Sequence, residues 1–377
     1  MATQLINVFL AVFTGIYAVL VWYMRAGWLA LPVFSKKTRP VTKVSVLIAA
    51  RNEEANIGRT LSDILAQDFP ADLLEVIVVD DHSTDNTSAI VQTFAPLGVK
   101  LLKLNESEPL NSYKKKAIST AIAVATGELI VTTDADCRMG KNWLATIVSY
   151  VEQHHSFLVS APVIYSEQRS FFEELQTLEF LYLIGLGAAG IGHRRPSTCN
   201  GANLAYRRDV FHEMGGFNGI DHLASGDDEL FLHKVAAKYP DKVGFCKSRD
   251  AIVYTDAKAN LRGFLHQRKR WASKSTHYKN KGLVALGVAI WLFNCLLLFT
   301  GIAVLCCDTV LWPMFTLALA MKLMVECCFL YPLCRFAKRM GLLAYLPLLT
   351  VLHIVYMVYI GMAGNIGKYQ WKGRRVN

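Results

Sequence analysis

The amino-acid sequence predicts an α/β domain built on a mostly parallel β-sheet, held at a membrane by helices near both ends of the chain. Three observations lead to this prediction. The 377-residue chain is 53% hydrophobic, which is high for a fully soluble enzyme. Long apolar runs lie near both ends of the sequence. Between them, short apolar segments alternate with helical patterns, and this alternation is typical of a parallel sheet covered by helices on both faces.

The first apolar run, residues 5–24, contains no charged residue and is long enough to cross about 30 Å of hydrocarbon as a helix. No basic segment precedes it and no clear small-residue cleavage site follows it. We therefore expect a retained anchor within residues 1–34 rather than a cleaved signal peptide. About three more membrane helices are expected within residues 283–364, from the runs 283–307, 309–334 and 341–363.

The formal net charge of +10 does not indicate a nucleic-acid partner, because the basic residues gather beside the apolar runs. They follow the first run and precede the second: Lys36, Lys37, Arg39 and Lys43, then Arg262, Arg268, Lys269, Arg270, Lys274, Lys279 and Lys281. Such clusters mark the cytoplasmic side of membrane proteins and attract anionic headgroups. We expect an integral, multi-pass protein of the inner or plasma membrane, with the middle of the chain in the cytoplasm.

The nine cysteines show no paired C-x-x-C spacing, and six of them lie in the C-terminal apolar runs. Cysteine behaves there as a small apolar residue. The sequence therefore indicates neither disulfides nor zinc.

Residues 43–258 form the predicted α/β domain. Strands are expected at 44–50, 76–81, 99–104 and 128–134, and helices at 54–67, 84–94 and 115–125. Ligands of such sheets bind at the carboxyl ends of the strands. Three of these ends carry polar residues that a strand does not need: Arg51-Asn52-Glu53, Asp80-Asp81 and Asp134-Ala135-Asp136. Turn or helix-capping chemistry explains any single group, but three groups in register favour one shared crevice.

Asp134 and Asp136 lie within one turn of each other, so their mutual repulsion needs compensation. A divalent cation, Mg²⁺ or Mn²⁺, is the ordinary means, because it takes few protein oxygens and completes its shell with phosphate and water. We expect Asp136 to be a direct ligand and Asp134 to contact ribose or to support the ligands from behind. Such an ion also neutralises a departing diphosphate, and Lys115 and Lys116 are expected to add positive charge near the same phosphates. The P-loop pattern GxxxxGK[ST] does not occur in the sequence, which disfavours an ATPase.

Two later motifs carry further candidate residues. Asp227, Asp228 and Glu229 follow a Gly turn at the start of a predicted helix, where acidic residues also suit the helix dipole. A carboxylate at this point could equally deprotonate an attacking hydroxyl. The stretch QRKRW, residues 267–271, lies in a predicted interfacial segment, 259–282. It reads either as a juxtamembrane basic helix or as a site where Trp271 stacks on a ligand and Gln267 and Arg270 bind its oxygens.

In order along the chain, VSVLIAARNEE, EVIVVDDHSTDNT, the KKKA helix start, TTDADC, SGDDE and QRKRW resemble the motif series of membrane-bound, inverting family-2 glycosyltransferases of the GT-A fold. The resemblance covers residues 43–271. It implies that Ala50, Asn52, Glu53 and Asp80 line a nucleotide pocket with Asp81 beside it, and that Asp134 and Asp136 hold diphosphate and metal. It implies that Asp228 is the base and that the acceptor side and its closure involve Asn200, Gly201, Asn203, Asp227, Gln267, Arg270 and Trp271.

The expected donor is a nucleotide diphosphate sugar, with a UDP-sugar favoured. Two acceptors fit the motifs: a lipid that receives one sugar, or the growing glycan of a processive polysaccharide synthase. We favour the lipid, because the sequence has one N-terminal anchor and a small C-terminal cluster, which disfavours a secretion channel. A non-catalytic membrane receptor for nucleotides or anionic lipids is the alternative outside the enzyme class.

Three membrane features have two interpretations each. Residues 168–192 begin as an amphipathic helix that suits either a soluble core or, as we slightly favour, the bilayer surface. Lys322 and Glu326 can pair on one helix face, for packing or for function. The basic tail, 365–377, should be cytoplasmic, yet an anchor followed by three full spans would leave it outside. Either residues 341–363 re-enter without crossing, or the tail violates the rule.

Overall fold

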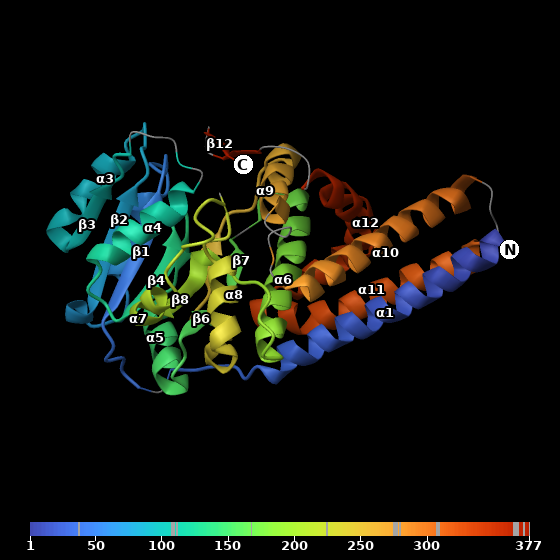
Figure 1. Cartoon of the computed structure of the whole chain (residues 1–377), viewed down its shortest axis with the longest axis horizontal. Coiled ribbons are helices and arrows are strands. Elements are labelled where there is room, and N and C mark those ends of the chain that lie inside the picture. Colours follow the sequence, from blue (N-terminus) through green and yellow to red (C-terminus); the bar gives the residue numbers. More distant parts are fainter. Residues whose placement is uncertain are drawn as a thin grey trace. The chain divides into compact units, whose positions relative to one another are not determined.

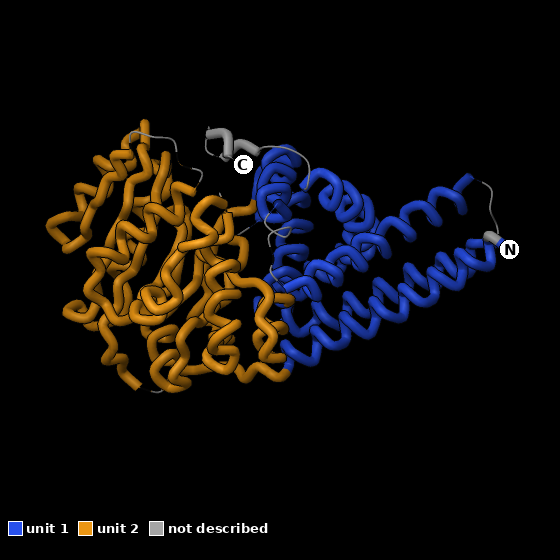
Figure 2. Tube along the Cα trace, viewed as in Figure 1, with its two compact units in different colours: residues 1–29, 168–185, 258–369 blue, residues 30–167, 186–257, 370–377 orange. Residues whose placement is uncertain are grey.

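The computed structural model describes the chain except residues 37, 107–109, 111, 167, 224, 274–277, 279, 307–309, 365–368, 372–373 and 377. The chain divides into two compact units (Figure 2). Unit 1 comprises Met1–Leu29, Gln168–Gly185 and Lys258–Tyr369, and unit 2 comprises Ala30–Glu167, Leu186–Ala257 and Gln370–Asn377. Unit 2 contains the sheet, and unit 1 is helical (Figure 1).

The main sheet of unit 2 has seven strands in the order β3-β2-β1-β4-β8-β6-β9. Their bounds are β1 Val44–Ala50, β2 Leu74–Asp80, β3 Val99–Lys103, β4 Leu129–Asp134, β6 Leu158–Ser160, β8 Leu204–Arg207 and β9 Val243–Phe245. The first four strands pair in parallel, β8 runs antiparallel to both of its neighbours, and β9 is parallel to β6. The predicted mostly parallel sheet is therefore confirmed. A smaller sheet joins β5 (Arg138–Met139), β10 (Val253–Thr255) and β7 (Val163–Tyr165).

The core strands form because their residues are apolar on both faces. β1 and β2 are almost wholly buried, as expected for strands covered by helices on both sides. The helices of unit 2 are α2 Ile57–Leu65, α3 Thr87–Thr93, α4 Tyr113–Val124, α5 Trp143–His154, α7 Arg208–Glu213 and α8 Glu229–Lys238, with short 3-10 turns at Ala71–Leu73, Ala95–Leu97, Gly201–Asn203 (η3) and Pro240–Lys242. The last strands, β11 (Tyr369–Trp371) and β12 (Arg374–Val376), pair only with each other.

Helix α3 begins later than the sequence predicts. A helix was expected from Thr84, but α3 starts at Thr87. The carboxylate of Asp85 accepts hydrogen bonds from the backbone N–H and the hydroxyl of Thr87, so the residues before it form a turn instead. Helix α2 also begins later than predicted, at Ile57 instead of Glu54, because a backbone turn precedes it in which the carbonyl of Glu53 accepts from the N–H groups of Asn56 and Ile57.

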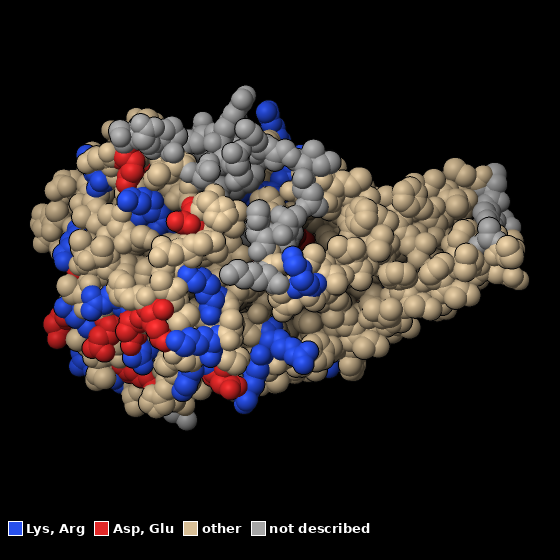
Figure 3. Space-filling view, in the orientation of Figure 1, with Lys and Arg blue, Asp and Glu red and all other residues tan. Residues whose placement is uncertain are grey.

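Unit 1 contains α1 (Ala2–Ala30), the first part of α6 (Phe171–Gly192), α9 (Leu261–Ser273), α10 (Lys281–Cys306), α11 (Trp312–Ala337), the 3-10 helix η6 (Met340–Tyr345) and α12 (Leu346–Ala363). Five helices are long and apolar enough to cross a membrane: Thr3–Ala30, Phe171–Gly192, Lys281–Cys306, Trp312–Ala337 and Met340–Ala363. In the space-filling view, the surface at the right of the picture carries no coloured Lys, Arg, Asp or Glu on the face shown (Figure 3). The exposed residues of α1 include the apolar Phe9, Val12 and Val19.

Lys322 and Glu326 of α11 form the predicted ion pair, buried inside unit 1. The hydroxyl of Tyr17 on α1 donates to Glu326 Oε1 over 2.6 Å, and that of Thr350 on α12 donates to Oε2 over 2.9 Å. This polar cluster joins three helices and satisfies both carboxylate oxygens of Glu326. A charge buried without such partners would be strongly destabilising.

Candidate functional site

The strand register of unit 2 brings the predicted polar strand ends to one edge of the sheet. Ala50 of β1 lies opposite Asp80 of β2, and Ala49 of β1 lies opposite Asp134 of β4. Because these strands are parallel and side by side, their carboxyl ends open onto the same edge. The loops that follow carry Asn52, Glu53 and Asp81, so the structure places these residues around one edge, as the sequence predicts.

The loops after β1 and β2 are fastened to each other by side chains. Asn52 adopts a left-handed conformation (φ 51°), which asparagine tolerates, and its side-chain oxygen accepts from the backbone N–H of Thr84 over 2.8 Å. The guanidinium of Arg51 donates to the carbonyls of Asp81 and His82 over 2.8 and 2.9 Å. These polar residues therefore shape the two loops as well as lining the edge.

Asp80 and Asp81 are both buried. Asp80 accepts hydrogen bonds from the N–H of Ser83 at 3.0 Å and from the hydroxyl of Ser88. Asp81 Oδ1 lies 3.0 Å from His82 Nδ1. Glu53 lies on the other loop, where its N–H donates to the hydroxyl of Thr87 over 2.7 Å. The turn chemistry that competes with a nucleotide-binding role is thus present at each of these residues.

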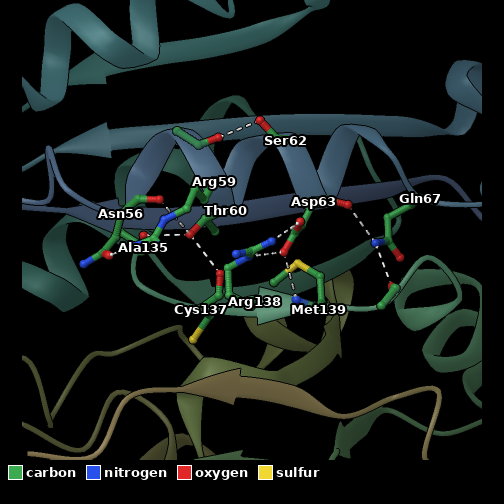
Figure 4. Close-up of polar contacts among 12 residues, drawn as sticks. Asn56, Arg59, Thr60, Ser62, Asp63, Gln67, Ala135, Cys137, Arg138 and Met139 are labelled. Carbon is green, nitrogen blue, oxygen red and sulfur yellow. Dashed lines mark hydrogen bonds and ion pairs between the residues drawn. The ribbon is translucent and has the colours of Figure 1, made fainter. Parts of the chain in front are cut away.

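The loop that carries Asp134 and Asp136 is held from behind by α2 (Figure 4). The Thr60 hydroxyl lies 2.8 Å from the carbonyl oxygens of both Ala135 and Cys137, which share its one proton. Asp63, one turn further along α2, binds the guanidinium of Arg138 at 2.5 and 3.0 Å. The contacts leave the backbone of this loop little freedom, so they fix the positions from which the side chains of Asp134 and Asp136 extend. The sequence analysis did not identify Thr60.

Replacing Thr60 by Val is expected to weaken donor and metal binding about tenfold without unfolding the protein. The substitution keeps the side-chain volume but leaves two buried carbonyls without their donor, at a cost of about 1–3 kcal/mol for each unsatisfied group. The loop would relax to find other partners, and the carboxylates would lose their orientation. Metal and nucleotide-sugar affinities of the purified protein, measured by calorimetry, check this prediction. Ser62→Ala is the matched control, because the Ser62 hydroxyl bonds only within α2, to the Gly58 carbonyl. Equal metal and nucleotide-sugar affinities for Thr60→Val and wild type would show that the loop with Asp134 and Asp136 keeps its conformation without the Thr60 hydroxyl.

Cys137 lies buried beside the two carboxylates. Burial raises the pKa of its thiol well above the ordinary value, and the neighbouring carboxylates of Asp134 and Asp136 add to the effect. The thiol is therefore protonated, and it donates to Asp136 Oδ1 over 3.9 Å.

Lys114, at the start of α4, joins the two acidic segments. Its ammonium lies 2.8 Å from Asp134 Oδ1 and 3.5 Å from Asp227 Oδ2. Partial burial disfavours the charged form, but Asp134 and Asp227, with Asp228 further off, outweigh this and hold the pKa of Lys114 above its ordinary value. Acidic residues 93 positions apart, 134 and 227, thus share one cation. This contact is the direct structural link between the strand-end carboxylates and the SGDDE turn.

The two lysines that the sequence analysis selected lie elsewhere. The buried Lys115 ammonium donates to the carbonyls of Leu223 and Ser225, at 2.5 and 2.8 Å, and so tethers the segment before Asp227. Lys116 is half exposed and pairs with Glu106 at 3.5 Å. The positive charge beside the carboxylates therefore belongs to Lys114, the first of the three consecutive lysines.

Replacing Lys114 by Met is expected to move two affinities in opposite directions. Without the ammonium, Asp134 and Asp227 carry uncompensated negative charge, so a divalent ion alone should bind more tightly. A nucleotide diphosphate should bind about tenfold more weakly, since a charge-assisted hydrogen bond contributes about 1.5–3 kcal/mol. Separate calorimetric titrations with Mn²⁺ and with UDP measure the two effects, and Lys116→Met is the control. A shift of both affinities in the same direction would contradict this role for Lys114.

Asp228 caps α8 and contacts the segment 200–203, which the sequence predicts on the acceptor side. Its Oδ1 accepts from the N–H of Glu229 at 2.7 Å, and its Oδ2 accepts from the N–H of Gly201 at 2.9 Å. A Cβ at Gly201 would lie 3.3 Å from both Asp227 Oδ2 and Asp228 Cβ, so a larger residue would crowd both aspartates. The bond to Glu229 therefore agrees with the helix-cap explanation of Asp228. The second bond adds something that a cap does not need: it fixes the carboxylate against the predicted acceptor segment.

Asn200 and Asn203 differ in what they can contact. Asn200 accepts from the N–H of Ala202 at 3.0 Å and shapes the η3 turn. Asn203 is fully buried, and its amide bonds the carbonyls of Pro162 and Ala251 and the indole N–H of Trp143. Asn203 thus fixes the segment 200–203 to the core of unit 2, and both its amide nitrogen and its amide oxygen bond to other residues of the protein.

The QRKRW stretch lies on α9, in unit 1. Its buried residue is Arg268, which pairs with Glu179 of α6 through both carboxylate oxygens and lies 4.3 Å from the centre of the Trp271 ring. Gln267 accepts from the same guanidinium at 2.8 Å. Arg270, the residue selected from the sequence, is only partly buried. Arg268 therefore anchors the motif helix, and Trp271 and Gln267 are both held by it.

The carboxylates of the site suit a divalent ion only in part. No group of three or more His, Cys, Asp and Glu side chains in the described part of the chain is arranged to hold a metal by itself. Asp134 and Asp136 with a Lys114 ammonium already beside Asp134 fit a different kind of site, in which a hard cation is shared between one or two carboxylates and the substrate's phosphates. The residues fit Mg²⁺ or Mn²⁺ brought together with a nucleotide, and not an all-protein metal cage.

Comparison with known proteins agrees with this geometry. Residues 45–215 match the family model described as Glycosyl transferase family 2. The chain is 28% identical over 251 residues to the probable glycosyltransferase YdaM of Bacillus subtilis, covering 64% of this chain and 57% of that protein. It is 27% identical over 241 residues to a beta-monoglucosyldiacylglycerol synthase of Synechocystis sp., covering 62% and 48%. The chain spans about half the length of these curated relatives.

A solved structure shares the fold. The mannosyltransferase PcManGT from Pyrobaculum calidifontis, in complex with GDP-Man and Mn²⁺, superposes with a TM-score of 0.60 over 94% of this chain and 99% of that chain, at 22% identity. The GT-A type of α/β fold that the sequence predicts is confirmed. The residues that match the family model, 45–215, all lie in the part of the chain that carries this fold or in the helix α6 within it.

Proposed function

We propose that the chain is a membrane glycosyltransferase that moves one hexose from a nucleotide diphosphate sugar, a UDP-sugar in first place, to a lipid acceptor with inversion at the anomeric carbon. The observation that carries the proposal is the Lys114 ammonium between Asp134 and Asp227, with Asp228 in the adjoining position. Carboxylates from two remote segments and one cation are thereby gathered where a parallel sheet binds its ligands. A diphosphate is the ligand class that both the lysine and a shared divalent ion suit.

The residues have separate tasks in the proposed reaction. Asp228 takes the proton of the acceptor hydroxyl while the oxygen of that hydroxyl attacks the anomeric carbon. The bond from that carbon to the diphosphate oxygen breaks in the same step, so the configuration inverts and the nucleoside diphosphate leaves. Lys114 compensates the negative charge that grows on the leaving diphosphate. A bound Mg²⁺ or Mn²⁺, held by Asp136 and Asp134, would supply Lewis-acid stabilisation of the same charge.

The other predicted residues support binding. Ala50, Asn52, Glu53, Asp80 and Asp81 would receive the nucleotide at the strand ends. Gln267, Arg270 and Trp271 would close over donor and acceptor, with Arg268 and Glu179 holding their helix in place. Asn200, Gly201 and Asp227 would border the acceptor.

The lipid acceptor is proposed from the membrane helices and from one relative. Five helices of the chain have the length and composition of membrane spans. The Synechocystis relative is named as a glucosyldiacylglycerol synthase, and its acceptor class is the one we propose for this chain. We propose that unit 2 works at the cytoplasmic face, because the basic residues gather beside the apolar runs.

The test is transfer by the purified full-length protein in lipid nanodiscs, supplied with a panel of UDP- and GDP-sugars and either Mg²⁺ or Mn²⁺. Mass spectrometry of the extracted lipids should show one species heavier by a single hexose, absent when the ion is chelated. A ladder of longer products would instead identify a processive polysaccharide synthase. Nucleotide binding without transfer to any lipid or glycan would identify a non-catalytic receptor.

A further inference from the structure

Helix α12 and the preceding turn, Met340–Ala363, are long and apolar enough to cross a membrane. Hydropathy alone would therefore make this segment a third span after α10 and α11. The contacts within unit 1 give the positions of its two ends, and these decide whether it can cross.

The helices α10 and α11 form an antiparallel hairpin. The ring of Phe315 lies 3.1 Å from the position of a Cβ on Gly301, close to the connection between the helices. Further from that connection, Tyr17 of α1 contacts both Phe293 of α10, at 5.0 Å between ring centres, and Glu326 of α11. The start of α10 at Lys281 and the end of α11 at Ala337 therefore share the end of the hairpin opposite the connection.

Helix α12 begins at that shared end. Only two residues separate the end of α11, Ala337, from the start of η6 at Met340. Tyr345, at the end of η6, contacts Phe171 of α6 with 5.1 Å between ring centres. The next residue, Phe172, contacts Phe264 of α9 at 5.8 Å. The start of α12 thus lies near the basic helix α9.

Helix α12 also ends at α9. Tyr356 contacts Phe264 at 5.5 Å between ring centres, and the Lys269 ammonium lies 5.2 Å from the centre of the Tyr359 ring. A Cβ on Gly364 would lie 2.7 Å from Cβ of Ala272, so the backbone just after α12 touches the last turn of α9. Because α9 ends at Ser273, shortly before α10 begins at Lys281, both ends of α12 lie at one end of the hairpin.

Helix α1 differs from α12 because its two ends lie at opposite ends of the α10–α11 hairpin. Trp28, near the end of α1, contacts Phe336, near the end of α11, at 5.4 Å between ring centres. Tyr17 lies beside Glu326, so α1 and α11 run in the same direction. The N-terminus therefore lies at the end of the bundle where α10 connects to α11, and in Figure 1 it does so, whereas α12 does not extend there.

We infer that Met340–Ala363 does not cross the membrane but enters one leaflet and returns, forming an interfacial layer with α9 whose partner is the lipid of that leaflet. The side chains of Leu348, Val351, Leu352, Val355 and Met362 on α12 are exposed and apolar, and continue the exposed apolar surface of α1, α10 and α11. The opposite side of α12 packs on α9 and α10. Helix α6 does not cross either, because the segments on both sides of it belong to unit 2.

This arrangement gives three crossings, by α1, α10 and α11, and places the basic tail on the same side as α9. The side of α9 also receives Lys281, Arg335, Lys338 and Arg339, at helix ends. The first residues of the chain, the end of α10 and the start of α11 lie at the other side, and the sequence has no Lys or Arg in residues 1–5 or between Cys306 and Trp312. The positive-inside rule is then obeyed throughout, and the conflict raised by the tail in the sequence disappears.

Two measurements on the full-length protein in native membranes test the inference independently of any activity. The first is oxidative cross-linking of the pair Ala272→Cys and Gly364→Cys, with linked peptides identified by mass spectrometry. We expect a yield at least about tenfold above that of the control pair Val310→Cys and Gly364→Cys, since disulfides require Cβ atoms about 3.5–4.5 Å apart. Linking of the control pair instead would mean that α12 crosses.

The second measurement is protease access to tags in sealed vesicles. A tag after Asn377 and a tag before Met1 should lie on opposite sides of the membrane, with the C-terminal tag on the side of unit 2. If α12 crosses, the two tags become accessible together. That outcome would overturn the inference even if the engineered cysteines perturbed the helix packing.

Discussion

Replacing Asp228 by Asn is expected to lower kcat by about 10²–10⁴-fold while changing the affinity for the nucleotide sugar little, because an amide cannot accept the proton of the acceptor hydroxyl. Asn has nearly the same shape as Asp, so the capping position at the start of α8 stays filled. One of the two hydrogen bonds, to the N–H of Glu229 or of Gly201, would be lost. Single-turnover transfer and calorimetric donor binding, measured on the same preparation, separate the two effects.

The control for this variant is Asp241→Asn, which removes an exposed carboxylate paired with Arg194 in the same unit. It should leave kcat unchanged. Wild-type turnover by Asp228→Asn would mean that another group deprotonates the acceptor, and a parallel fall in donor affinity would mean that Asp228 acts only through folding of the segment around Gly201.

Replacing Asp136 by Asn is expected to weaken donor binding at a given Mn²⁺ concentration and to shift its metal dependence to higher Mn²⁺ concentrations. Asp136 is the proposed direct ligand. Loss of a residue that only supports a metal ligand lowers metal affinity about 10–100-fold, so loss of Asp136 should lower it by at least as much. The fold should survive, since the loop is held by Thr60 and Asp63 through the backbone and Arg138 rather than through this carboxylate. Donor affinity measured over a series of Mn²⁺ concentrations checks the prediction.

Excess Mn²⁺ should restore part of the donor affinity of Asp136→Asn, whereas it should not restore turnover of Asp228→Asn. Asp209→Asn, an exposed carboxylate paired with Arg207, is the control. An unchanged Mn²⁺ dependence in Asp136→Asn would remove the metal assignment and would leave Lys114 as the counterion of the diphosphate.

The sheet was predictable because its signal is local and repeated. The apolar run Val44–Ala50 gives the observed bounds of β1, and the carboxyl ends of β1, β2 and β4 could be aligned by the general rule for parallel strands. The convergence of Asp80 and Asp134 on one edge follows from that rule alone.

Side-chain choices within a motif were not predictable. Three consecutive lysines begin α4, and only the rotation of the helix decides that Lys114 faces Asp134 while Lys115 turns to the carbonyls of Leu223 and Ser225. The same reason selects Arg268 over Arg270 on α9. Thr60 gave no signal at all, since its partners are backbone carbonyls of a distant loop.

For the membrane helices, too, the sequence predicts one property and not another. Hydropathy measures whether a segment is long and apolar enough, and it found α10, α11 and α12 alike. It carries no information on where the helix ends, which here depends on contacts of Tyr345 with α6 and of Gly364 with α9. In the sequence, the positive charge of the tail was the feature that raised the alternative of a segment 341–363 that re-enters without crossing.

The most direct test of the proposed function is calorimetric titration of the purified full-length protein with UDP-glucose and GDP-mannose, with and without Mn²⁺. Binding of a nucleotide sugar that weakens when the ion is chelated, and that is weaker in Asp136→Asn than in the wild type at the same Mn²⁺ concentration, is the predicted result. No heat of binding with either sugar nucleotide, in the presence or absence of the ion, would contradict the claim that these carboxylates and Lys114 form a nucleotide-sugar site.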